Sequence, residues 1–161
     1  MKRLFTILLA VVMGMVAVDS AKASDVFAKN DVLGSVTLGF GHGFGQRFAI
    51  DYGVADGWLN NKASLGIGAS LNNTIGWGFN SDVLSLIVNC SFHYQFVDKL
   101  DTYVVAGIGG GLGFAGGHVG GGVDWTSALG VRYYFSPTVA FNVEAGHTNS
   151  CYVNMGLTFR F

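Results

Sequence analysis

Residues 151–161, with the sequence CYVNMGLTFRF, decide the fold. The odd-numbered positions of this stretch are all apolar, whereas Asn154, Gly156, Thr158 and Arg160 occupy even-numbered positions. Successive side chains of a β-strand point to opposite faces, so the stretch predicts one strand with an apolar side and a polar side. An apolar side of this kind can pack on a protein core or face lipid, and the rest of the chain distinguishes the two.

The same alternation recurs along the chain and predicts an all-β protein of eight strands. The expected strands cover residues 35–40, 47–54, 64–71, 84–95, 104–113, 125–134, 139–146 and 151–161. Gly-, Asn- and Asp-containing segments separate them, with loops expected at residues 72–82 and 116–122 and a tight polar turn at 97–102. After Thr102, Val104, Ala106 and Ile108 are expected outside and Gly107 and Gly109 inside. This register is the least defined, because Tyr103 and Val105 would also suit an apolar face.

The composition favours lipid as the environment of the apolar faces. Charged residues make up 12% of the chain, about half the usual share, and 50% of the residues are hydrophobic. No stretch after Val18 is long enough for a membrane helix, and 25 glycines disfavour long helices. In a soluble lipocalin-like barrel, the alternative, the outer surface would carry charges, whereas the polar faces here are mainly Gly, Ser, Thr and Asn. The sequence therefore predicts an eight-stranded antiparallel up-and-down transmembrane β-barrel, whose closure leaves no unpaired sheet edge in lipid.

Residues 1–23 have the features of a cleaved secretory signal peptide. Lys2 and Arg3 precede an apolar stretch at residues 4–18, and Ala21 and Ala23 occupy the positions that a signal peptidase reads. Residues 24–161 would then form a single barrel domain. Without the first 23 residues, six basic and nine acidic residues remain, a net charge of about −3, and no basic run suggests nucleic-acid binding.

Three segments resemble the small eight-stranded outer-membrane barrels of the OmpA/OmpX type. Residues 98–109 resemble a periplasmic turn and the following strand of that family, and residues 130–137, followed by Glu144, resemble its last periplasmic turn. Residues 151–161 resemble the terminal strand that the barrel-assembly machinery reads, and the assembly signal would comprise Tyr152, Met155, Leu157, Phe159 and Phe161. The resemblance implies an integral, monomeric protein of the outer membrane of a Gram-negative bacterium, surrounded by lipids and lipopolysaccharide. Its biogenesis partners would be periplasmic chaperones and the barrel-assembly machinery. The resemblance is specific for architecture and weak for function, because this fold hosts unrelated functions.

Six charged or ionisable residues are expected inside the barrel: Arg47, Asp51, His93, Arg132, Glu144 and Arg160. An eight-stranded barrel is just wide enough for side chains to fill it, and buried charges must be paired. If residues 136–137 form a turn, Arg132 lies beside Asn142 and diagonal to Glu144, which predicts an Arg132–Glu144 ion pair in a plugged lumen. A narrow pore is the alternative.

Catalysis, cofactors and metals are not expected. His147, Ser150 and Glu144 could form a hydrolytic triad at an outer rim, as in lipid A deacylases, but Glu144 is expected to face inward. His42, His93 and His118 lie on separate segments without metal-ligand spacing. Cys90 and Cys151 are expected as free thiols, buried or facing lipid. The sequence thus predicts a structural or surface-interaction role, with a rim-site lipid-modifying enzyme as the alternative.

Overall fold

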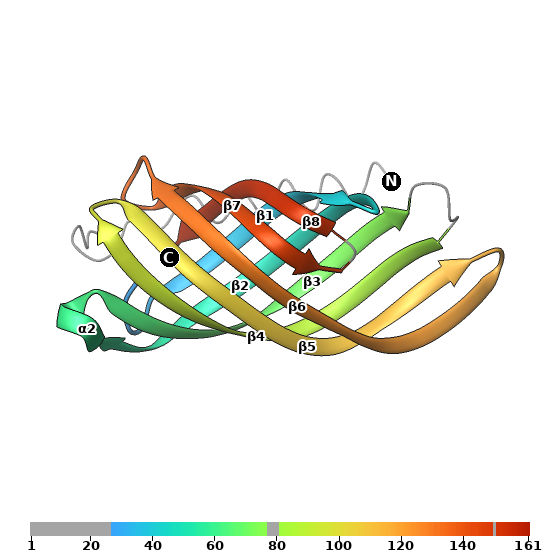
Figure 1. Ribbon diagram of the computed structural model, residues 1–161, viewed down its shortest axis with the longest axis horizontal. Helices are drawn as coiled ribbons and strands as arrows, with labels where there is room; N and C mark the ends of the chain where they lie inside the picture. Colours follow the sequence, from blue (N-terminus) through green and yellow to red (C-terminus); the bar gives the residue numbers. More distant parts are fainter. Residues whose placement is uncertain (1–26, 77–80, 150) are drawn as a thin grey trace.

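A computed structural model of the chain describes residues 27–76, 81–149 and 151–161; the predicted signal peptide lies outside them. Eight antiparallel strands form a closed barrel in the order of the sequence, which confirms the predicted up-and-down architecture (Figure 1). The elements are β1 Val32–Gly41, β2 Gly43–Gly57, α2 Trp58–Asn61, β3 Ala63–Gly76, β4 Ser81–Val97, β5 Leu100–Ala115, β6 His118–Tyr134, β7 Val139–Thr148 and β8 Cys151–Arg160. Among the described residues, no helix is both long and apolar enough to span a bilayer.

The first and last strands close the barrel. Val36 on β1 pairs with Leu157 on β8, so the alternation that characterises the terminal strand is continued by its neighbour. The turn between β2 and β3 contains α2, a single turn that Gly57 initiates with a left-handed φ of 86°. A residue with a side chain rarely adopts this conformation, which glycine adopts without strain.

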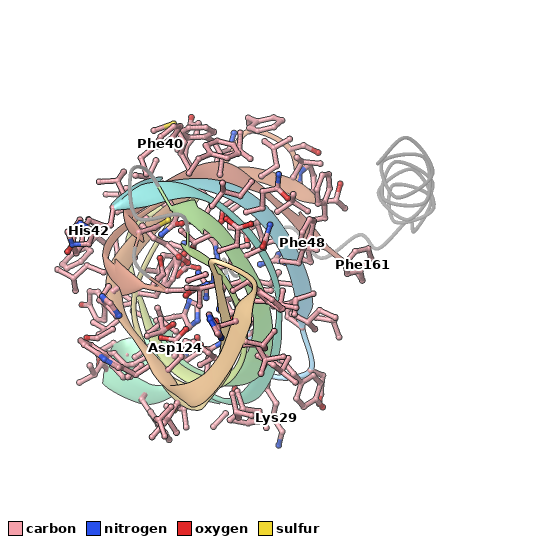
Figure 2. The ribbon with its side chains drawn as sticks, turned by 90° about the vertical axis from the view of Figure 1, so that its right-hand side faces the viewer. Lys29, Phe40, His42, Phe48, Asp124 and Phe161 are labelled. Atoms are coloured by element: carbon pink, nitrogen blue, oxygen red, sulfur yellow. The ribbon has the colours of Figure 1, made fainter. Side chains whose placement is uncertain are left out.

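The two faces of the sheet differ in chemistry around the whole barrel. Outward positions carry exposed apolar residues such as Leu86, Ile108 and Leu129, whereas inward positions are buried and mostly polar. Figure 2 shows the nitrogen and oxygen atoms gathered within the ring of strands and a mainly carbon fringe outside it. The register of β5 agrees with the predicted one, since Val104 is 48% exposed and Tyr103 only 4%.

Two predicted loops are too long, because strands extend into them. In the expected loop 72–82, β3 extends to Gly76, with Thr74 buried and Ile75 exposed. In the expected loop 116–122, only Gly116 and Gly117 form the turn, and β6 already begins at His118. Glycines carry no side-chain alternation, so the sequence pattern could not reveal a strand there.

A β-bulge in β8 corrects the predicted orientation of Cys151. The pairing with β1 shifts between Phe40 and Gly41, so that Tyr152 and Val153 are both exposed. A bulge inserts one extra residue and thereby reverses the faces beyond it. Cys151 consequently points into the barrel, where it is 2% exposed, and not to the apolar outer face.

The hairpin of β5 and β6 reaches further than the other strands (Figure 1). β6 pairs with β5 from His118 to Tyr133, but with β7 only from Thr126 onward. Among the strands that the structure describes, residues 118–125 therefore have a neighbour on one side alone. This hairpin lies at the end of the barrel opposite the start of β1 and the end of β8.

Candidate functional site in the barrel interior

The barrel interior holds the ionisable side chains of the described chain that are most deeply buried. All six residues expected there are inside, with exposed fractions of 1–7% for Arg47, Asp51, His93, Arg132, Glu144 and Arg160. They come from five different strands, so only barrel closure brings them together. Their partners determine what this site can do.

Glu144 and Arg47 form the central ion pair of the lumen. Their side chains meet across the barrel from β7 and β2. The Tyr103 hydroxyl lies 2.6 Å from the other Glu144 oxygen and 2.8 Å from the amide oxygen of Asn142. A carboxylate is the stronger acceptor, so we assign the single tyrosine proton to Glu144. Both oxygens of this buried carboxylate are thereby bonded.

The predicted Arg132–Glu144 ion pair is wrong. Arg132 donates to Asp51 at 2.8 Å and lies 3.6 Å from Asp101, while its guanidinium sits 4.1 Å from the centre of the Tyr103 ring. The predicted register was correct, because Arg132 does pair with Asn142. The long side chain, however, extends across the lumen to Asp51 on β2, while Asp101 contacts it from the directly paired position on the neighbouring strand β5. Strand register fixes where a side chain starts, and the packing of the lumen decides where it ends.

Asp101 and Tyr103 are interior residues that sequence reasoning missed. Asp101 is 1% exposed and was expected in a polar turn, whereas it belongs to β5. In the predicted strand, Gly107 and Gly109 face inward. The same alternation, continued toward the start of the strand, would have placed Asp101 and Tyr103 in the lumen as well. The turn signals at Asp98 and Lys99 obscured this continuation.

Gly130 gives Tyr103 the space to lie flat against the barrel wall. A β-carbon at Gly130 would come within 2.1 Å of the Tyr103 ring. The two residues are direct cross-strand partners on β5 and β6. The glycine therefore positions the ring that supports both Glu144 and Arg132.

Ser91, His93 and Asp101 form a hydrogen-bonded chain in the order of a hydrolase triad. His93 Nε2 lies 2.9 Å from the Ser91 hydroxyl, and Nδ1 lies 2.9 Å from Asp101. A nucleophile must reach the substrate carbonyl, but Ser91 is only 2% exposed. The centre of the Phe27 ring lies 4.1 Å from that of the His93 ring, so that Phe27 covers this side of the hydrogen-bonded chain. The arrangement satisfies buried polar groups and gives Ser91 no open route to a substrate.

Residues 27–31 fold over the end of the barrel where β1 begins. The backbone N–H of Asn30 donates to Gly53 at 2.8 Å, and Gly53 donates to Asp31 at 2.9 Å. Asp31 also lies 3.4 Å from Arg160 of the last strand. A cavity of about 210 Å³ remains at this end, lined by Phe27, Ser64 and His93 among others. The segment thus covers the charged layer without filling the whole mouth.

The other half of the lumen is mostly uncharged, with the carboxylate of Asp124 on its inward side. Its inward residues carry hydroxyls, amides and the thiol of Cys151, which lies 3.8 Å from the Thr74 hydroxyl. Asn72 and Asn89 both donate to Ser70, at 3.4 and 3.1 Å. Cys90 is exposed on the outer face, and neither cysteine is in a disulfide.

The residues considered for a rim-site triad are not brought together. The His147 ring stacks on Trp125, with 4.2 Å between the ring centres, whereas Glu144 is bonded inside the lumen. Ser150 lies outside the described residues. Within the described part of the chain, no three His, Cys, Asp or Glu side chains are grouped to hold a metal ion.

Comparisons with known proteins agree with this architecture. No family model and no curated protein matches the chain. A de novo designed transmembrane β-barrel is 19% identical, with 83% of this chain and 97% of that chain covered and a TM-score of 0.55. The N-terminal β-barrel domain of Pseudomonas aeruginosa OprF is 16% identical, with 83% and 98% covered and a TM-score of 0.53. Ail, the attachment invasion locus protein of Yersinia pestis, is 15% identical, with 83% and 99% covered and a TM-score of 0.44. The first two show that the fold is that of small transmembrane barrels of the outer-membrane type.

Proposed function

We propose that the chain is an integral outer-membrane barrel with a plugged interior, which acts without catalysis in envelope structure or surface contact. The observation that carries this proposal is the ion-pair network across the lumen, in which Arg47 pairs with Glu144 and Arg132 with Asp51. Such a network ties three strands together, β2, β6 and β7, and occupies the space that a pore would need. Placement in the outer membrane of a Gram-negative bacterium follows from the barrel type and from the predicted signal peptide.

The outer surface supports integral membrane placement. Leu86, Val88, Ile108 and Leu129 are each at least 60% exposed, and such residues surround the barrel. Contiguous apolar surface of this extent is not stable in water. Heat-modifiable migration in detergent gels and resistance to carbonate extraction are expected, whereas release by carbonate alone would reject integral insertion.

Conductance separates the plugged barrel from the narrow pore. Purified wild-type protein in planar lipid bilayers should show conductance near background. The double substitution Arg47→Ala and Glu144→Ala removes the central pair without leaving a lone charge, and it is the variant best suited to reveal conduction. Defined single-channel steps from the wild-type protein would favour the pore and contradict the plug.

A lipid-modifying enzyme is the remaining candidate. His147 stacks on Trp125 at the outer rim, but its predicted acidic partner Glu144 is bonded to Tyr103 in the lumen. Overexpression should therefore leave the acylation pattern of lipid A unchanged in mass spectra. A changed pattern that His147→Ala abolishes would replace the structural proposal with an enzymatic one.

A further inference from the structure

The free edge of β6 has a sequence that is complementary to itself. Residues 118–125 read HVGGGVDW, and β7 does not pair with any of them. Around Gly121, an antiparallel pairing of two copies sets Val119 opposite Val123 and His118 opposite Asp124. Both pairs occur twice, as a two-fold symmetric contact requires. We propose that this edge binds the same edge of a second copy of the chain.

The edge lacks the features that keep exposed strands from pairing. Natural sheets protect long edges with lysine, proline or bulges, and residues 118–125 contain neither lysine nor proline. Their pairing with β5 continues residue by residue, without a register shift. Alternate residues of such an edge direct both their N–H and C=O groups outward, ready for a new partner strand.

Two apolar side chains on this edge are strongly exposed. Val119 and Val123 are 66% and 78% exposed. They lie beyond the end of β7, on the part of the hairpin that protrudes past the rest of the barrel, and in the proposed outer-membrane placement water surrounds them. Pairing would bring the two valines of one copy against those of the other, which reduces their contact with water.

Charge complementarity fixes the register. Asp124 accepts a hydrogen bond from its neighbour Trp125 through one oxygen, at 2.8 Å. Its second oxygen is buried against the inner face of the hairpin and has no hydrogen-bond partner within the described residues, so a turn of the carboxylate would present it to a donor on a paired strand. In the proposed pairing, His118 of the second copy lies directly opposite Asp124 on the same sheet face and can donate a ring N–H to this carboxylate.

The geometry determines where the second copy must be. The two-fold axis of an antiparallel strand pair is perpendicular to the sheet, and here the sheet is the barrel wall. A rotation about that axis reverses the barrel direction, so the two barrels meet tip to tip. The inference therefore rests on the proposed outer-membrane placement, and it describes adhesion between copies in facing membranes while each barrel remains a monomer in its own membrane.

A mixing experiment tests this register. Asp124→Lys should place lysine against histidine in the pair, and His118→Asp should place two aspartates opposite each other. Cells of either variant alone are expected to aggregate about tenfold less than wild-type cells, because the first variant loses the carboxylate that accepts from His118 and the second sets two aspartates opposite each other. A mixture of both variants pairs His118 with Asp124 and the introduced lysine with the introduced aspartate, so mixed cells should aggregate again. Asp82→Lys, the same charge change on exposed β4 at this end, should behave as wild type.

Surface display is measured in parallel, with an epitope inserted between Gly116 and Gly117 in a separate strain. If intact cells bind the antibody but wild-type cells do not aggregate, the self-pairing is overturned and the membrane placement stands. Variants that lose aggregation without recovery in the mixture would show that the edge binds a different partner, which also overturns the self-pairing. If the epitope is reached only after the cells are broken, the placement itself is wrong and the inference falls with it.

Discussion

Glu144 on β7 is bound by Arg47 on β2, a residue 97 positions earlier in the chain, and not by its diagonal neighbour Arg132. Both side chains are nearly inaccessible, with exposed fractions of 6% for Arg47 and 2% for Glu144. A buried charge without a partner is far more costly than a buried pair. This cross-lumen bond therefore joins opposite walls of the barrel.

The first prediction concerns the loss of this pair. Glu144→Ala leaves Arg47 buried without its carboxylate and should lower the free energy of unfolding in detergent by about 3–5 kcal/mol. Denaturant titration followed by tryptophan fluorescence measures the change. In double-mutant cycles, Glu144→Ala should couple more strongly to Arg47→Met than to Arg132→Met. Equal or stronger coupling to Arg132 would contradict the observed partners.

Gly130→Ala tests the support of Tyr103. Its new β-carbon would lie 2.1 Å from the Tyr103 ring, which must then move away from Glu144 and Arg132. A loss of about 1–3 kcal/mol is expected from this overpacking. Gly122→Ala is the matched control on the same strand, because no atom lies within 4 Å of its added carbon. Similar losses for both variants would mean that strand conformation, and not the Tyr103 contact, causes the effect.

A substitution on the outer face of the terminal strand tests whether that face contacts lipid. Met155 is 41% exposed on the outer face, and Met155→Arg should cost about 2–4 kcal/mol near the bilayer centre. Val123→Arg introduces the same side chain on the protruding hairpin, where water surrounds it, and should leave stability nearly unchanged. The comparison requires refolding into lipid vesicles. Equal costs at both positions would remove the distinction between the lipid-facing belt and the hairpin.

Thiol labelling tests the bulge in β8. In single-cysteine variants, Cys90 should react with a membrane-permeant maleimide in the folded protein because it is exposed. Cys151 is 2% exposed and should react only on unfolding. Mass spectrometry of samples labelled before and after denaturation measures both rates. Rapid labelling of folded Cys151 would place it on the outer face, as the uninterrupted alternation had predicted.

Deletion of Phe161 separates assembly from stability. In the structure, its backbone N–H donates to Val32 at 3.0 Å, while its ring is only partly buried. We expect the truncated protein to be degraded or to accumulate in the periplasm, yet to fold when diluted into detergent micelles. Normal assembly in cells would reject the assembly signal, whereas failure to fold in detergent as well would indicate that Phe161 acts through packing.

The sequence by itself determined the barrel, because alternation of apolar and polar residues is a local property that each strand displays separately. It also identified the inward charges, including Arg47 and Glu144, since strand parity alone assigns them to the lumen. Strand parity gave the wrong orientation for Cys151, because one extra residue in the bulge reverses the alternation. It also missed the strand at residues 118–122, because glycines show no alternation of side chains.

Only the tertiary structure decided which charges meet. The partner of Arg132 depends on how long side chains share a closed lumen, in which Asp51 reaches it from β2, 81 positions earlier in the chain, and Asp101 and Tyr103 from the adjacent strand β5. The extent of the β5–β6 hairpin beyond β7 is likewise a property of pairing and not of composition. Local patterns fix the direction in which each side chain points, whereas closure of the sheet fixes what lies in that direction.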